Sequence, residues 1–148
     1  METKASKTIQ ILTCQIGDYL FGMDVVGCRE ANKNLPISKV PLARDYIAGI
    51  VNLRGDVATV LNLHTLLGFE ITKNHSDAYV IIRLKSDKKH LAIKADRVID
   101  VIDVNTDNLE PIPSHLDDIE TGYLSSAIKT ANDLILIIDT QSILNLKH

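Results

Sequence analysis

A short acidic run is the first candidate in this chain for binding a metal ion. Asp103, Asn105 and Asp107 have the alternate spacing of the oxygen ligands that open an EF-hand calcium loop. The rest of the run departs from that loop, because Asn108 stands where the loop needs glycine and Ser114 where it needs a bidentate glutamate. We therefore expect no calcium site here.

Other patterns that would support catalysis or metal binding are missing from the sequence. Its histidines occur singly, and none has a second histidine, cysteine or carboxylate at a metal-ligand spacing on the same element: His64, His75, His90, His115 and His148. Ser125 and Ser126 lie in GYLSSA, which lacks the Gly-x-Ser-x-Gly turn that exposes a nucleophilic serine. The sequence also has no glycine-rich loop that could hold a phosphate. We therefore expect a protein that is not an enzyme and needs no metal or cofactor.

The cysteines do not suggest redox chemistry. Cys14 and Cys28 are the only two, both lie in apolar, strand-like contexts, and their spacing fits neither a metal site nor a disulfide framework. Free cysteines of this kind behave as small apolar residues. The sequence predicts two buried free thiols.

Arg54 and Glu30 form the charged pair that the sequence singles out. Arg54 lies between Leu53 and Gly55 at the tip of a predicted hairpin, and Glu30 ends a predicted strand of the same unit. Two interpretations stay open. Arg54 is either an exposed turn residue, for which an ion pair contributes about 0–1 kcal/mol, or half of a partly buried pair, whose disruption costs about 3–5 kcal/mol.

The stretch from Ile47 to Leu67 must position Arg54. Its first run, IAGIVNL, is apolar and rich in β-branched residues, and DVATVLNL continues the same pattern after a polar turn, which predicts a β-hairpin. Gly55-Asp56 suits a tight reversal, because glycine adopts a positive φ that other residues resist. The segment from His64 to Gly68 then predicts a short helix that Gly68 can cap.

Further short strands are expected on both sides of this hairpin. They are predicted at 8–16, 19–30, 35–40, 79–84, 90–104 and 134–138, and a closing helix at 140–146. Residues 1–7 are predicted to be a flexible tail, and the polar stretch 70–77 to connect two halves. Strands this short, with turn signals between them, favour small closed barrels over an open sheet.

The two halves also resemble each other. The alignment brings the following residues opposite one another: Phe21 and Leu91, Met23 and Ile93, Cys28 and Val98, Glu30 and Asp100, Val57 and Leu134, Val60 and Ile137, Asn62 and Asp139, and Leu67 and Leu144. Matches in the same order indicate a duplicated β unit. We therefore predict an all-β domain over 8–148, with one barrel at about 17–69, into which a terminal segment could be swapped, and a second at about 77–142.

Length and composition agree with a single soluble domain. At 148 residues with 45% hydrophobic content, the chain can bury a core without metals or disulfides. A net charge of -3, with scattered Lys and Arg, gives no footprint for nucleic acid or anionic lipid. The sequence has no apolar stretch long enough to cross a bilayer, so we expect a cytoplasmic protein that does not insert into membranes.

Several motifs resemble one known family. The run GIVNLRG followed by DVATVLNL is similar to the signature of the CheW family, the coupling proteins of bacterial chemotaxis. The resemblance continues through YVIIRL, LAIKADRVIDV, LEPIPS and LILIIDTQSIL in the family's order. It implies two five-stranded, SH3-like β-barrel subdomains with short helices. It also implies a non-catalytic adaptor that binds the regulatory domain of the histidine kinase CheA and the cytoplasmic tip of chemoreceptors, and is recruited to membrane-associated receptor arrays.

The resemblance also implies which residues contact partners. Asn52, Arg54 and Gly55 fall on the signature turn, Gly49 on the glycine that precedes it, and Glu30 on the acidic residue of the second strand. Looser matches place Cys28, Tyr79 and Val101 at strand positions associated with receptor docking. We expect a groove between the barrels to take the apolar face of a receptor helical hairpin, with a patch of the first barrel facing the kinase, and Gly49 to admit a partner helix. A coupling module for another chemosensory pathway, controlling motility or gene regulation, is the alternative.

Overall fold

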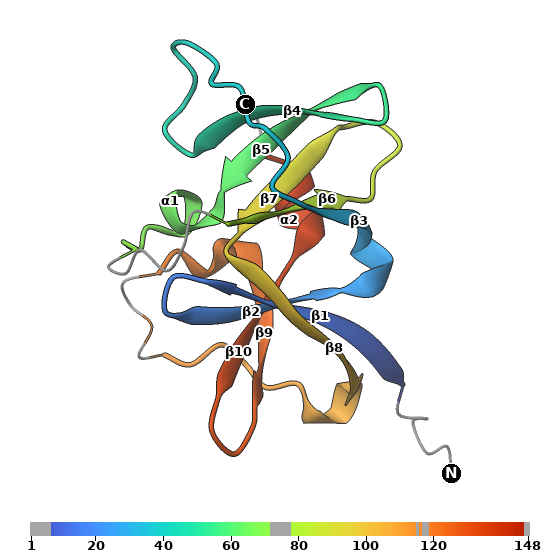
Figure 1. Ribbon diagram of the computed structural model, residues 1–148. Helices are drawn as coiled ribbons and strands as arrows, with labels where there is room; N and C mark the ends of the chain where they lie inside the picture. Colours follow the sequence, from blue (N-terminus) through green and yellow to red (C-terminus); the bar gives the residue numbers. More distant parts are fainter. Residues whose placement is uncertain (1–6, 72–77, 115, 117–118, 147–148) are drawn as a thin grey trace.

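The computed structural model describes residues 7–71, 78–114, 116 and 119–146 (Figure 1). The strands are β1 (Thr8–Ile16), β2 (Tyr19–Asp24), β3 (Cys28–Lys33), β4 (Ile47–Leu53), β5 (Asp56–Asn62), β6 (Val80–Leu84), β7 (Leu91–Ala95), β8 (Arg97–Asn105), β9 (Leu124–Lys129) and β10 (Leu134–Ile138). The helices are α1 (Leu63–Leu67) and α2 (Thr140–Leu144), with 3-10 turns η1 (Val25–Gly27), η2 (Thr106–Asn108) and η3 (Thr121–Tyr123). The predicted tail lies outside the described residues except for Lys7, and most of the predicted connection, 72–77, also lies outside them.

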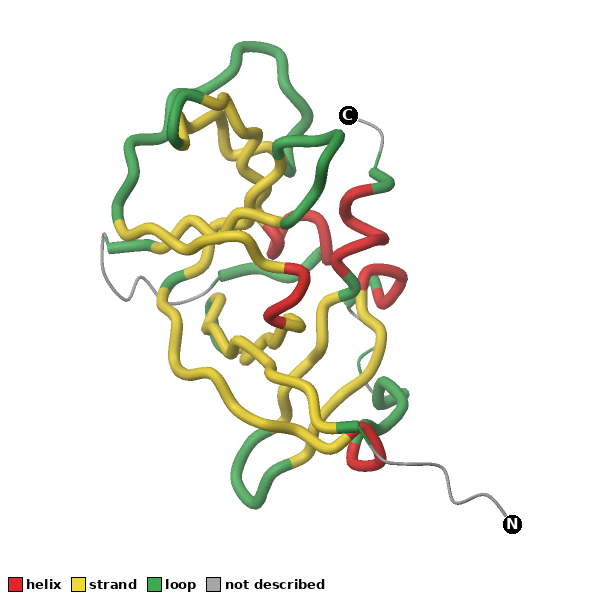
Figure 2. Tube along the Cα trace, turned by 90° about the vertical axis from the view of Figure 1, so that its right-hand side faces the viewer, coloured by secondary structure: helices red, strands yellow, loops and turns green. Residues whose placement is uncertain are grey.

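The strands form two five-stranded sheets. In the first sheet the order is β8-β1-β2-β10-β9, and in the second it is β3-β6-β7-β5-β4. Figure 2 shows the two groups of strands one above the other, with α1 and α2 near their junction. The predicted all-β class with two five-stranded, SH3-like units is confirmed.

The predicted repeat is confirmed in the register of the strands. In the first sheet β10 runs parallel to β2 with Leu136 opposite Phe21, and in the second β5 runs parallel to β7 with Thr59 opposite Leu91. The sequence alignment makes these two pairs equivalent. The repeat extends to the helices, because α1 and α2 each begin directly after the aligned pair of Asn62 and Asp139.

The sheets do not follow the predicted division of the chain into 17–69 and 77–142. The first repeat, β1–β5, gives two strands to the first sheet and three to the second, and the second repeat, β6–β10, does the reverse. The exchange begins where the chain turns out of a hairpin: η1 leads from β2 into β3, and Asp96 separates β7 from β8. These breaks also interrupt the predicted strands 19–30 and 90–104.

Neither sheet closes fully into the predicted barrel. Along the described chain, the end strands of each sheet are joined only through an isolated bridge, Ser38 to Ile50 in one case and Glu110 to Ala127 in the other. The predicted strand at 35–40 is reduced to its bridge at Ser38, where the flanking Pro36 and Pro41 lack the amide hydrogens that a ladder needs.

The core has three parts. One cluster lies inside the first sheet and includes Ile11 and Ile137, and another lies inside the second sheet and includes Val60 and Ile81. The largest cluster contains residues of both sheets and both helices, with Phe21 at 0% exposure. Because most of the core lies between the sheets, we expect them to depend on each other for stability.

The repeated helix starts allow a matched test of capping. The Asp139 carboxylate accepts hydrogen bonds from Gln141 N at 3.1 Å and Ser142 N at 3.4 Å, whereas Asn62 makes no side-chain cap bond. Asp139→Ala should therefore lower the free energy of unfolding by about 1 kcal/mol, and Asn62→Ala should change it much less. Urea denaturation of both variants measures the difference. Equal losses would contradict a capping role for Asp139.

Candidate partner-binding site

The turn between β4 and β5 carries three of the predicted partner-binding residues. Arg54 and Gly55 have φ of 52° and 87°, and Leu53 pairs with Asp56 across them. Two positive φ values in a two-residue hairpin loop are typical of a type I′ turn. The reversal is thus centred one residue earlier than the predicted Gly55-Asp56. The Asn52 side-chain oxygen accepts a hydrogen bond from Gly55 N at 3.1 Å and stabilises the turn.

The predicted pair of Arg54 and Glu30 is confirmed. Arg54 Nε lies 3.4 Å from Glu30 Oε2, and Asn32 Nδ2 donates to the other carboxylate oxygen at 2.8 Å. The Arg54 side chain is 81% exposed and that of Glu30 only 15%. A pair this open to solvent contributes little to stability, about 0–1 kcal/mol, which favours the first of the two interpretations. The ion pair instead holds the exposed guanidinium of Arg54 beside the oriented carboxylate of Glu30.

A bulge in β3 orients Glu30. Strand β3 pairs with β6 so that Cys28 faces Leu84 and Glu30 faces Arg83, with a register shift between them. The other sheet has the same irregularity at the aligned position, where β8 shifts register opposite Thr13 and Cys14. Because a bulge redirects the side chains beside it, the repeated fold presents Glu30 in the second sheet and Asp100 in the first.

The sequence analysis missed Arg83, which lies behind this pair. Its side chain is 2% exposed, and its Nη2 donates to Asp56 Oδ2 at 3.0 Å and lies 2.9 Å from His90 Nδ1. The hydrogen bond from Arg83 holds the pKa of the Asp56 carboxyl below its usual range, and the charges of His90, Arg83 and Arg29 act in the same direction. A single arginine within the apolar run YVIIRL was the signal that could have identified it.

Gly49 is required by contacts within the chain. Its φ is +150°, and a Cβ added there would press on the backbone oxygen of Ser38 and lie 2.6 Å from Ile37 Cγ2. Ser38 exchanges two backbone hydrogen bonds with Ile50, the next residue. The approach of the chain's own backbone is by itself a reason for glycine here, and the approach of a partner helix stays a prediction.

A groove lies between the two sheets, and we call it the seam groove. It has a volume of about 360 Å³ and is lined by the end of β3, the residues before and at the start of β6, and the start of β8: Ala31, Lys33, Asn34, Ala78, Tyr79, Val80, Asp96, Arg97 and Val98. Tyr79 is the predicted residue that lines it. The Tyr79 hydroxyl donates to Leu35 O, and Lys94 Nζ lies 5.0 Å from the ring centroid, so the ring is fixed in place.

Cys28 and Val101 lie on the strands beside the seam groove rather than in its lining. Val101 and Ile99 on β8 are each 46% exposed and are large apolar side chains. Cys28 begins β3 and is half-buried, and burial raises the pKa of its thiol to about 11. Burial also raises the pKa of Cys14 to about 12. Both thiols therefore stay protonated near neutral pH and act as apolar groups.

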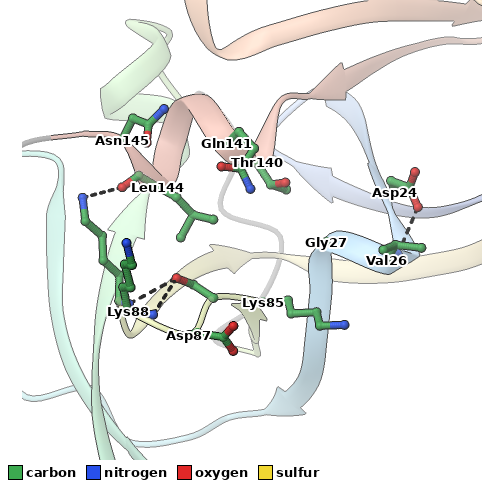
Figure 3. A pocket seen from close by; sticks show the side chains of 12 residues that line it. Asp24, Val26, Gly27, Lys85, Asp87, Lys88, Thr140, Gln141, Leu144 and Asn145 are labelled. Carbon is green, nitrogen blue, oxygen red and sulfur yellow. Dashed lines mark hydrogen bonds between the residues drawn. The ribbon is translucent and has the colours of Figure 1, made fainter.

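A larger groove of about 720 Å³ contains none of the predicted residues (Figure 3). It is formed by η1, the β6–β7 turn and α2. Its lining includes Lys85, Lys88 and Lys89, other polar side chains, and the apolar Val26 and Leu144. Lys89 Nζ donates a hydrogen bond to Leu144 O, which connects the β6–β7 turn to the end of α2. Its lysines distinguish this groove from the apolar groove expected for a receptor hairpin.

In the acidic run at 103–107, a side chain forms a hydrogen bond with the backbone. Asn105 accepts a hydrogen bond from Asp107 N at 2.9 Å and caps η2. Among the residues that the structure describes, no three His, Cys, Asp or Glu side chains gather as a metal site. In that same part of the chain, no helix combines the length and apolar character needed to span a bilayer.

Comparison with known proteins identifies the family. A family model described as the CheW-like domain matches residues 10–148. The chain belongs to the CheW-like family. Chemotaxis protein CheW of Treponema pallidum is 27% identical to this CheW-like chain over 142 residues, covering 94% of it and 84% of the relative. Chemotaxis protein CheW of Thermotoga maritima is 24% identical over 140 residues, covering 95% and 90%. The crystal structure of the scaffolding protein TtCheW from Thermoanaerobacter tengcongensis superimposes with a TM-score of 0.78 at 27% identity, covering 89% of each chain.

Proposed function

We propose that this protein is a non-catalytic adaptor of chemotaxis, which couples chemoreceptors to the histidine kinase CheA. The family match over 10–148 carries the proposal, and it is supported by relatives named as chemotaxis proteins and a structural neighbour described as a scaffold. An adaptor of this kind acts by binding two partners at once, so its function lies in two surfaces. We further propose that it works in the cytoplasm, at receptor arrays.

The receptor surface, in this proposal, combines the seam groove with the β4–β5 turn. The groove offers apolar side chains such as Tyr79 and Val98, and Ile99 and Val101 on β8 extend the apolar area. An amphipathic helix of a receptor hairpin would place its apolar face there. The exposed Arg54 and the carboxylate of Glu30 would give polar contacts that set its orientation. Another patch would bind the regulatory domain of CheA.

Arg54→Ala separates a contact role from a structural one. Because Arg54 is 81% exposed, its removal should leave the unfolding temperature nearly unchanged. If it contacts the receptor, affinity should fall about tenfold. Calorimetric titration with a receptor cytoplasmic hairpin, beside a thermal melt, measures both quantities.

Lys129→Ala provides the matched control, because it removes an exposed cation from β9 of the other sheet. It should change neither quantity. Unchanged receptor affinity in Arg54→Ala would remove Arg54 from the receptor surface, and a large loss of stability would instead make it a structural residue.

A further inference from the structure

Arg83 is an unusual residue for its position. It is 2% exposed in β6, whose other residues are all apolar. Among the described residues, Thr13 is the only other polar residue that is buried. Removing a guanidinium from water has a high cost unless hydrogen bonds and opposite charge offset it. The contacts of Arg83 therefore indicate what its charge does in the fold.

Those contacts join the two sides of the Arg54–Glu30 pair. On one side, the backbone of Arg83 pairs with Glu30 across β6 and β3. On the other side, its guanidinium holds Asp56, which directly follows the β4–β5 turn and pairs with Leu53. One buried residue thus links the strand that carries the carboxylate to the base of the turn that carries the guanidinium.

The first sheet supplies a comparison without such a link. Thr13 occupies the position aligned with Arg83, and its hydroxyl donates to Asp100 O at 2.9 Å and accepts from Asp100 N at 3.1 Å. These bonds hold the bulge in β8. Thr13 therefore supports the aligned bulge, and these side-chain hydrogen bonds both go to Asp100 rather than to the β9–β10 turn. The link to the turn belongs to the second sheet, where Arg54 and Glu30 lie.

We propose that Arg83 is a positioning residue for the partner-binding site, which holds the base of the β4–β5 turn so that Arg54 stays beside Glu30. This inference rests on the proposed function for its consequence in binding. That Arg83 holds the β4–β5 turn does not depend on the proposed function. Arg83 itself is too deeply buried to touch a partner, so any effect on binding must pass through the groups that it holds.

Arg83→Met tests the inference, because methionine keeps much of the apolar stem and removes the charge. Amide hydrogen exchange at 53–57 should become about tenfold faster, since these amides lose their anchor. Receptor affinity should fall about tenfold in the wild-type background and show no further fall in an Arg54→Ala background, because both changes act on one group. Thr13→Val is the matched control for the turn and should leave exchange at 53–57 unchanged, because its hydroxyl bonds Asp100 in the other sheet. Lys129→Ala remains the control for receptor affinity.

Each result decides a separate point. Unchanged exchange at 53–57 would overturn the positioning role, and equal affinity losses with and without Arg54 would show that Arg83 acts elsewhere. If Arg54→Ala itself leaves receptor binding intact, the proposed surface fails, and the exchange rates still decide whether Arg83 holds the turn. Asp56→Asn removes the same ion pair from its exposed side, and serves as the second variant if Arg83→Met does not fold. It should give the same pattern.

Discussion

Gly49→Ala should lower the free energy of unfolding by about 3 kcal/mol, through strain at a backbone angle that L residues avoid and through steric overlap. The added Cβ would meet the backbone of Ser38, which cannot rotate away as a flexible side chain would. Relief requires β4 to separate from Ser38 and lose the two hydrogen bonds of that bridge. Equilibrium unfolding in urea measures the loss.

Gly55→Ala is the natural control for this variant. Gly55 also has a positive φ, +87°, but a Cβ there meets nothing within 4 Å. Its replacement should therefore cost only the left-handed conformation, about 1 kcal/mol. If the two variants lose equal stability, the contact with Ser38 has no energetic role, and Gly49 becomes available again as a docking position.

The result also decides how binding data at Gly49 are interpreted. A bulky residue such as arginine at this position would disturb the bridge that joins Ser38 to β4 before any partner arrives. Loss of receptor binding in such a variant would therefore report damage to the fold. Arg54, which is exposed and lies in the turn that follows the same strand, is the better probe of docking.

The sequence could predict those features that depend on the residue types within one segment or one repeat. The repeat was visible because a buried position such as Phe21 must be apolar in both copies, and Leu91 meets the same requirement. The first helix was visible because Gly68, which ends it at a φ of 82°, is a typical C-cap residue. The pair of Arg54 and Glu30 followed from placing a hairpin tip and a strand end in the same predicted unit.

The features that could not be predicted depend on where strands go after a turn. The residues around η1 do not determine which sheet β3 joins, because pairing with either sheet would bury the same apolar face of β3. The partners of Arg83 were hidden for the same reason. Asp56 and His90 come from a different strand and a different turn, and only the assembled second sheet brings them to one guanidinium.

The exchange of strands predicts that neither half of the chain folds alone. A fragment covering 8–71 would carry β1 and β2 of the first sheet and β3–β5 of the second, and 78–146 would carry the complementary strands. Each fragment would expose the apolar residues of the central core, including Phe21 in one and Ile82 in the other. We expect both to be unfolded by circular dichroism and to regain a cooperative thermal transition when mixed.

Cleaving the folded chain distinguishes two effects: breaking the covalent connection between the halves, and removing the strands that one half supplies to the other. With a protease site placed within 72–77, cutting after folding should leave the transition cooperative, because the strands of both sheets stay paired. Refolding the separated pieces one at a time should then fail. A cooperative transition in 78–146 alone would mean that β6–β10 form a stable unit without β1 and β2, and the shared core between the sheets would not be what holds them together.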